Sequence, residues 1–258
     1  MNCIILKNQK LAEGFFYLSI KPKALIGGIK AGQFVMVRVG TSSVPLLRRP
    51  MGIADFKVDG SEFGLLIQIT GIGTRLLSNL VPGDNLDVLG PFGNGFPPDL
   101  KGEKIWAVAG GTGVAPFMGI AANNIFGNKF KLLLGARSAD FLLQTSFFSD
   151  RGIPVDVSTE DSTKGFGGLV TELVDKNIKS NGKPDVMFTC GPISMMKALA
   201  SVADEHNIPL YASLENRMAC GFGVCLGCVL KKQNEDRFFT VCRKGPVFLS
   251  SEVEILNT

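Results

Sequence analysis

The chain has 258 residues, of which 45% are hydrophobic and 19% are charged, and its formal net charge is +4. This composition excludes an intrinsically disordered chain, and the absence of Lys/Arg runs longer than pairs such as Arg48-Arg49 argues against a nucleic-acid partner. No apolar run reaches the ~18 residues that a membrane span needs, and the N-terminus lacks a secretory signal pattern, so we expect a cytoplasmic protein without a membrane partner.

The first hundred residues predict a β-rich domain. Short strand-like runs, separated by Gly, Pro and Asp turn signals, occupy residues 15–22, 32–40, 63–70 and 84–90. A short helix is expected at 74–80. Closely spaced strands of this kind indicate a small antiparallel barrel. We place this first domain at residues 1–99, because the Gly/Pro-rich stretch 90–102 is the best candidate for a boundary.

The next part of the chain alternates between strand-like and helical segments. Apolar strand-like runs occupy residues 105–110, 131–136, 155–159, 185–190 and 209–214. Helices are expected from 114 onward, near 169–179 and near 195–206. Such alternation is typical of a doubly wound parallel sheet with helices on both faces. We therefore expect an α/β domain over residues 100–214.

The tail over residues 215–258 is rich in glycine and cysteine. Four of the chain's six cysteines lie there with the spacing C-x4-C-x2-C-x13-C, namely Cys220, Cys225, Cys228 and Cys242. This spacing is the plant-type signature of a [2Fe–2S] cluster, in which each iron is held by two thiolates. Glycines at 221, 223 and 227 would let the loop turn sharply and point N–H groups at the sulfurs. A structural zinc site, or free or disulfide-bonded cysteines, stay open as alternatives.

A glycine loop, Gly110-Gly111-Thr112-Gly113, follows an apolar strand and opens a helix. Free N–H groups and the helix dipole at such a position favour an anionic pyrophosphate, and the glycines allow its close approach. The alternative is a tight strand-to-helix turn without a ligand.

A second loop, Cys190-Gly191-Pro192, ends another apolar strand ahead of a helix. Open α/β sheets bind ligands at this carboxyl edge, so we predict that this loop borders the same site. The alternative is that Cys190 is only a small buried hydrophobic residue.

The predicted barrel carries a weaker diphosphate signal. Arg48 and Arg49 precede Pro50-Met51-Gly52, and Gly73-Thr74 lies further along the chain. Guanidinium groups and glycine amides together could hold a second diphosphate. Both arginines could instead be ordinary surface charges.

Groups for general acid–base catalysis are scarce. The only histidine, His206, lies in a polar stretch that ends a predicted helix, and Glu160-Asp161 is typical of a solvated turn. The residues therefore favour a protein that carries electrons over one that removes a proton from carbon.

In this order, the motifs resemble the ferredoxin–NADP reductase superfamily and, more narrowly, the electron-transfer subunits of type B dihydroorotate dehydrogenases. The most specific segments are 214–228 and 241–248, which hold the four clustered cysteines. The resemblance covers nearly the whole chain. It implies an N-terminal antiparallel FAD-binding barrel, a doubly wound parallel-sheet NAD-binding domain and a small C-terminal [2Fe–2S] subdomain.

The resemblance also implies roles for particular residues. FAD would contact Arg49, Pro50, Met51, Gly52, Leu66, Ile67, Gln68, Gly73 and Thr74. NAD would contact Gly110, Gly111, Thr112 and Gly113, with Cys190, Gly191 and Pro192 against the nicotinamide. The cluster would be held by Cys220, Cys225, Cys228 and Cys242. No catalytic acid or base is implied.

The partner implied by the resemblance is an FMN-containing catalytic subunit that oxidises dihydroorotate to orotate in pyrimidine biosynthesis, in a heterotetramer of the two subunit types. Electrons would pass from FMN through the cluster and FAD to NAD⁺. A reductase subunit of a hydrogenase, sulfite reductase or bifurcating complex would share these cofactors. A regulatory module that senses redox state or NADH is a further alternative.

Three positions depart from the family pattern. Gly52 stands where relatives usually have serine, Gln68 where they have arginine, and Ile72 where they have lysine. Each change removes a polar contact worth about 1–3 kcal/mol if buried and charge-assisted, which bears on flavin affinity. Arg137-Ser138 could accept a 2′-phosphate, so NADP stays open beside NAD.

Overall fold

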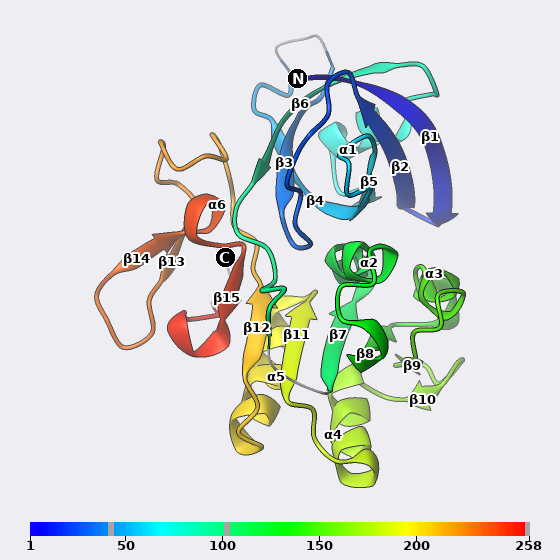
Figure 1. The fold of residues 1–258 in the computed structure, drawn as a ribbon, viewed down its shortest axis with the longest axis vertical. Helices are drawn as coiled ribbons and strands as arrows, with labels where there is room; N and C mark the ends of the chain where they lie inside the picture. Colours follow the sequence, from blue (N-terminus) through cyan, green and yellow to red (C-terminus); the bar gives the residue numbers. More distant parts are fainter. Residues whose placement is uncertain (41–43, 101–103, 256–258) are drawn as a thin grey trace.

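The computed structural model describes residues 1–40, 44–100 and 104–255. Its first half is a closed antiparallel barrel with the strand order β1-β2-β5-β4-β3-β6 (Figure 1). These strands are β1 (Asn2–Ala12), β2 (Phe15–Pro22), β3 (Phe34–Arg38), β4 (Arg49–Phe56), β5 (Phe63–Gln68) and β6 (Asn85–Phe92). The predicted barrel is confirmed.

Two barrel strands, β1 and β4, were not predicted from the sequence. Strand β1 turns polar after Leu6, and β4 contains Pro50 and Gly52, residues that strands disfavour. Proline is tolerated in β4 because pairing with β5 begins only at Ile53, so Pro50 has no β5 partner. Helix α1 (Ile72–Ser78) begins and ends two residues earlier than expected and buries Leu77.

The second half is built on a sheet with the order β10-β9-β8-β7-β11-β12-β15. Its strands are β7 (Ile105–Gly110), β8 (Phe130–Ala136), β9 (Val155–Thr159), β10 (Phe166–Gly167), β11 (Val186–Cys190), β12 (Leu210–Ser213) and β15 (Val247–Leu249). All neighbours pair in parallel except β15, which is antiparallel to β12. The predicted parallel sheet is confirmed, with one antiparallel edge strand that comes from the tail.

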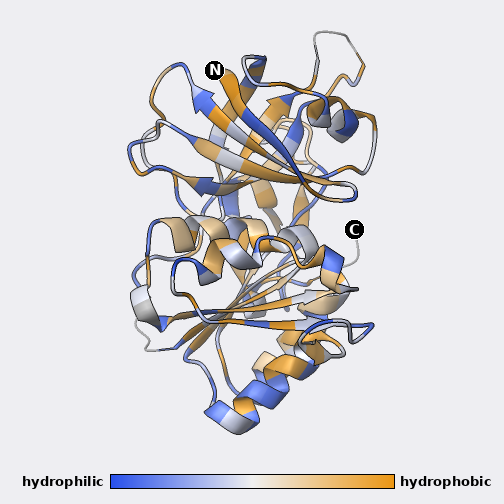
Figure 2. Ribbon diagram, turned by 90° about the vertical axis from the view of Figure 1, so that its right-hand side faces the viewer, coloured by the Kyte–Doolittle hydropathy of each residue, from blue (hydrophilic) through white to orange (hydrophobic). Residues whose placement is uncertain are grey.

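Helices cover both faces of this sheet. They are α2 (Ala115–Ala122), α3 (Thr145–Ser149), α4 (Val170–Asn181) and α5 (Ile193–Glu205). Strand β7 is buried on both sides: Ala107 and Ala109 face α2 and the barrel, whereas Trp106 and Val108 face α4 and α5. Figure 2 shows hydrophobic residues concentrated in the strands, while α4, at the bottom, is hydrophilic on its outer side.

The barrel and the sheet share one hydrophobic core. The ring of Phe96 lies 5.3 Å from that of Phe117 on α2 and 4.6 Å from that of Phe188 on β11. Gly119 on α2 permits close contact with the barrel, since a methyl group there would lie 2.7 Å from the ring of Phe56. Among the described residues, no helix is long and apolar enough to span a bilayer.

The tail packs against both halves. It contains β13 (Val229–Lys231), β14 (Phe238–Thr240) and the short α6 (Val241–Lys244), followed by β15. The buried core of this segment includes Phe34 and Met36 of β3 together with Cys228 and Cys242. The tail therefore completes the molecule on one side and is not an isolated appendage.

Candidate functional site

A cleft of about 880 Å³ lies at the carboxyl edge of the sheet. The chain adds β8 and β9 on one side of β7 and β11 and β12 on the other, so the cleft meets the topological switch point between β7 and β11. Its walls come from all three parts of the chain: Gln68 of the barrel, the glycine loop after β7, and Glu215 and Leu230 of the tail.

The two loops predicted to border the site interlock. A methyl carbon on Gly113 would lie 2.1 Å from the Cys190 carbonyl oxygen, and one on Gly110 would lie 2.9 Å from the Pro192 ring. Gly111 faces open space at φ +56°, where glycine is favoured. Gly110 and Gly113 thus allow the two loops to pack closely, as expected for a tight strand-to-helix turn. Gly111 instead has an unusual backbone conformation at the edge of the cleft.

The Cys190 thiol is buried at the end of β11. Burial and the nearby Glu215 carboxylate raise its pKa to about 12, although the Ser213 hydroxyl acts in the opposite direction. Cys190 is therefore an uncharged thiol at neutral pH. Glu215 opens onto the cleft, and the surrounding protein raises its pKa by reducing its hydration. Glu215 was not predicted from sequence; its place directly after a strand end was the available signal.

Polar groups also line the far end of the cleft. Ser158, at the end of β9, is fully buried, and its hydroxyl has no hydrogen-bond partner among the described residues. Glu160 and Arg137 lie on the cleft wall beside it, and the Arg137 guanidinium lies 5.9 Å from the centre of the Phe141 ring. Asp161, by contrast, accepts a 2.6 Å bond from the Thr163 hydroxyl within its own turn.

On the barrel, Arg49 lies over the start of α1. Its Nη1 donates to the Leu47 carbonyl oxygen at 2.6 Å, and a methyl carbon on Gly73 would lie 3.1 Å from its Nε. The Thr74 hydroxyl closes the turn by accepting from the Thr70 N–H at 2.9 Å. The first-turn N–H groups of a helix have no intrahelical partner, so Arg49 and this bare backbone form a cradle suited to an anion.

The other residues predicted to contact FAD differ in their position and burial. Gln68 lies on the cleft wall, whereas the side chains of Leu66 and Ile67 are buried in the barrel core. Pro50 and Met51 are half-buried along β4, and Gly52 is exposed.

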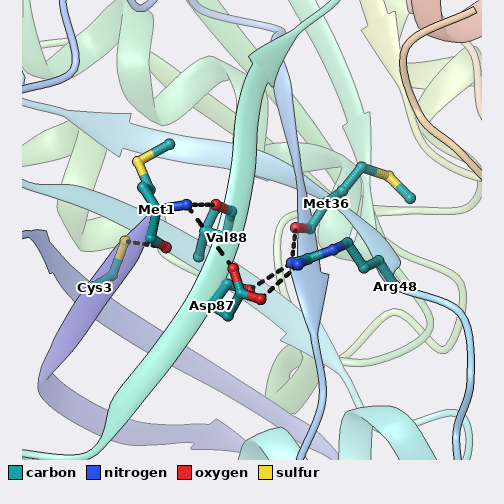
Figure 3. Close-up of polar contacts among 6 residues, drawn as sticks. All are labelled: Met1, Cys3, Met36, Arg48, Asp87 and Val88. Atoms are coloured by element: carbon teal, nitrogen blue, oxygen red, sulfur yellow. Dashed lines mark hydrogen bonds and ion pairs between the residues drawn. The ribbon is translucent and has the colours of Figure 1, made fainter.

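Arg48 points elsewhere (Figure 3). Its Nη2 lies 2.5 Å from Asp87 Oδ2, and its Nη1 donates to the Asp87 carbonyl oxygen at 3.0 Å. The Met1 ammonium donates to the Val88 carbonyl oxygen at 2.6 Å beside this ion pair. Arg48 therefore joins the barrel strands, and the two adjacent arginines do not form one anion-binding fork.

The four clustered cysteines are brought together as two pairs. The Cys225 N–H donates to Cys220 Sγ at 3.4 Å, and the Cys242 N–H donates to Cys228 Sγ at 3.4 Å. Cys225 is exposed, whereas Cys228 and Cys242 are buried. The order of the chain thus places the first two cysteines together near solvent and the last two together in the core.

The pKa values of two of these thiols are shifted in opposite directions. Burial acts to raise the pKa of Cys220, but N–H groups of Cys225, Phe222 and Val224 lower it to about 6. Burial and the neighbouring Cys228 and Cys220 sulfurs raise the pKa of Cys242 to about 12. Amide groups directed at sulfur are a means by which proteins stabilise and tune iron–sulfur clusters.

The arrangement fits a binuclear cluster better than a single zinc ion. Within the described ranges, no three Cys, His, Asp or Glu side chains gather around one metal position. Two pairs of thiols match two irons that each take two thiolates, whereas structural zinc needs four ligands around one point. Gly221 and Gly223 adopt positive φ as the loop turns, but Gly227 does not; Leu226 has φ +56° instead.

A closed barrel, a parallel sheet with a cleft at its switch point and a four-cysteine tail define an oxidoreductase of the ferredoxin–NADP reductase fold. The solved structure of an NADH-dependent reduced ferredoxin–NADP oxidoreductase superimposes with a TM-score of 0.84 at 30% identity and covers 97% of this chain and 89% of that chain. Ferredoxin–NADP⁺ reductase from Plasmodium falciparum shares the fold, with a TM-score of 0.63 at 15% identity over 80% of this chain and 89% of that chain.

Residues 215–254 match the family described as the iron–sulfur cluster binding domain of dihydroorotate dehydrogenase B. The chain is 35% identical over 258 residues to the dihydroorotate dehydrogenase B (NAD⁺) electron transfer subunit of Fusobacterium nucleatum, covering 98% of each protein. It is also 35% identical to that of Bacillus pumilus, over 97% of this chain and 96% of the relative. The chain belongs to this family of electron transfer subunits, so the predicted resemblance is confirmed.

Proposed function

We propose that this chain relays electrons between NAD(H) and a dihydroorotate-oxidising catalytic subunit, using FAD and a [2Fe–2S] cluster. One observation carries the proposal: a single cleft is lined by the barrel, by the glycine loop of the sheet and by the first residues of the cysteine tail. A nucleotide and a flavin meeting there would lie beside the segment that holds the cysteines. The full-length similarity to electron transfer subunits supports the same assignment.

The cradle of Arg49 and Gly73 is the proposed site of the FAD diphosphate, with Thr74 closing the turn. When bound, flavin accepts a hydride and returns single electrons, so it connects the two-electron nicotinamide to a one-electron cluster. The interlocked loops at Gly113 and Cys190 are the proposed site of the NAD diphosphate and nicotinamide. The predicted contacts of the remaining flavin residues stay predictions.

We favour NAD over NADP as the nucleotide. The relatives are named for NAD⁺. Glu160 lies on the cleft wall at the end of β9, where a carboxylate would accept hydrogen bonds from ribose hydroxyls and repel a 2′-phosphate. Arg137 on the neighbouring strand end is the group that would favour NADP.

The proposed partner is an FMN-containing catalytic subunit, in a heterotetramer of two subunit types. Electron transfer requires the partner to approach the cluster, and the cysteine loop presents Phe222, Val224 and Leu226 to solvent around the exposed Cys225. Contiguous exposed apolar side chains are typical of a protein interface. Four thiols kept for metal binding also suit a reducing compartment, which supports the cytoplasmic location that we propose.

Val224→Lys is expected to weaken binding of the catalytic subunit about 10-fold or more, because it places a charge at the centre of this apolar surface. Val58→Lys is the matched control, since Val58 is 77% exposed on the barrel and Val224 is 73% exposed. Titration calorimetry or native mass spectrometry would measure affinity and subunit stoichiometry. Equal affinity of the Val224→Lys and Val58→Lys variants would remove the cysteine loop from the proposed interface.

The relay is tested by an anaerobic visible spectrum of the purified chain during NADH titration. We expect bands of oxidised flavin and of a [2Fe–2S] centre to bleach together as NADH is added. A colourless protein, or flavin without iron, would contradict the relay and return the cysteines to a zinc role.

A second candidate is a reductase subunit of an electron-bifurcating complex. It is favoured by the structural likeness, over 97% of the chain, to a protein studied for flavin-based bifurcation. Copurification separates the two: a partner that reduces this chain with dihydroorotate supports the first proposal, and one that requires ferredoxin supports the second.

A further inference from the structure

We propose that Met36 is the positioning residue that seats the cysteine loop on the barrel and thereby fixes the approach of the cluster to the flavin. This inference rests on the proposed function, because it assumes that both groups bind where described above. Met36 lies on β3, outside the cleft and outside the cysteine motif.

The contact between Met36 and the loop is unusually close. A methyl carbon on Gly221, the residue after Cys220, would lie 2.3 Å from Met36 Cγ and 2.6 Å from its sulfur. Met36 is fully buried, and Gly221 has φ +82°. The methionine side chain therefore lies against the bare backbone of the loop, and no other residue type at 221 would permit this separation.

The backbone of Met36 also pairs with the strand that carries Arg49 of the flavin cradle. Met36 pairs with Pro50 across β3 and β4, and Pro50 follows Arg49 directly. Cross-strand partners project to the same side of a sheet. One side chain thus connects the residue after a cluster cysteine to the strand proposed to hold FAD.

An aromatic series connects the loop to β6 and β3. The Phe222 ring lies 6.1 Å from that of Phe92 on β6, which lies 6.0 Å from that of Phe34 on β3. Phe34 and Met36 belong to the buried cluster that includes Cys228 and Cys242. Phe222 is half exposed, whereas Met36 and Phe34 are buried, and Met36 is the one in direct contact with Gly221.

The step across this junction transfers one electron at a time and forms or breaks no bond. With NADH as the electron donor, the reverse of the direction expected with dihydroorotate, a bound flavin would take up the two electrons of the hydride and release them one at a time to the cluster. The rate of such a step depends on the distance and orientation of the two groups, so a shift of the cysteine loop away from the barrel would slow it. A flexible methionine suits an irregular junction of this kind.

The test compares Met36→Ala with Met36→Leu in the intact chain, and Met187→Ala serves as the control. Met187 is equally buried but lies in β11, remote from the loop. Stopped-flow spectroscopy separates flavin reduction by NADH from the later reduction of the cluster. In Met36→Ala we expect the second step to slow several-fold while the first keeps its rate, and Met36→Leu to restore the rate of the second step. Hydrogen exchange of the amides at 220–224 in the cofactor-free chain should quicken only in Met36→Ala.

Gly221→Ala gives an independent measurement if Met36→Ala assembles no cluster. Its methyl group collides with Met36, so we expect the same slow second step, partly relieved in the Gly221→Ala/Met36→Ala double variant because the colliding side chain is gone. Cluster reduction at the native rate in Met36→Ala or in Gly221→Ala would overturn the positioning role. A slow first step together with a slow second step would point to a failure of the flavin site instead.

Discussion

Replacing Cys225 with serine is expected to remove the iron–sulfur cluster and to abolish electron transfer to the catalytic subunit, while the chain still passes electrons from NADH to an artificial dye. Cys225 is exposed, so the fold does not depend on its side chain. Its thiol lies beside that of Cys220, and a serine hydroxyl does not ionise to supply the missing thiolate. Changes beyond the direct ligands already cost about 10- to 100-fold in metal affinity, and loss of a ligand should cost more.

Iron content and the visible spectrum measure the first effect, and parallel assays with the partner and with a dye measure the second. Cys3→Ala is the matched control because Cys3 is buried in the barrel, away from the clustered cysteines. Retention of iron and of transfer to the partner by Cys225→Ser would contradict the four-cysteine site. Loss of the dye activity would instead show that cluster and flavin site are not separable.

Substitution is a cleaner test than removal of the tail. A deletion from residue 215 onward would remove β15, which pairs with β12 through Ser213 and Val247, and would expose that edge of the sheet. It would also remove Glu215 and Leu230 from the cleft wall. A loss of activity in the deleted chain would therefore not identify the cluster as its cause.

The sequence predicted the elements whose signal is local. Runs of apolar residues predicted most of the sheet strands, and the glycine loop and cysteine spacing predicted the proposed sites, because each pattern is set by neighbours in the chain. Strand β4 was missed because Pro50 and Gly52 disfavour a strand locally, while its pairing with β3 overrides that preference. Strand β15 was missed because its three residues are too few to show the alternation of apolar and polar residues that predicts a strand.

The contacts that assemble the site are long-range, and they lay beyond sequence reasoning. Nothing in the local pattern brings Met36 to Gly221, or Glu215 to Cys190, because these pairs meet only through the packing of separate elements. The different positions of the Arg48 and Arg49 side chains have the same origin. Arg48 forms an ion pair with Asp87 on β6, whereas Arg49 lies against Gly73 at the start of α1. Adjacent identical residues thus acquire different roles from their tertiary partners.

Gly113→Ala is expected to disrupt the nucleotide cleft and to lower the stability of the chain. The new methyl group would lie 2.1 Å from the Cys190 carbonyl oxygen and 2.4 Å from its carbon, both backbone atoms that no rotamer change can move. Overpacking of a core costs about 1–3 kcal/mol, and a backbone collision belongs at the upper end of that range. The glycine loop and the loop at Cys190 must separate, so the KM for NADH should rise together with a fall in the unfolding temperature.

Gly27→Ala is the matched control, because a methyl group at Gly27 meets nothing within 4 Å and its backbone has no positive φ. Its thermal unfolding and NADH–dye kinetics should equal those of the native chain or show slight stabilisation. Flavin should stay bound to Gly113→Ala, since the Arg49 cradle lies in the barrel. If Gly113→Ala kept the native KM and unfolding temperature, the two loops would not be held by this contact, and the cleft would owe its shape to the barrel and the tail.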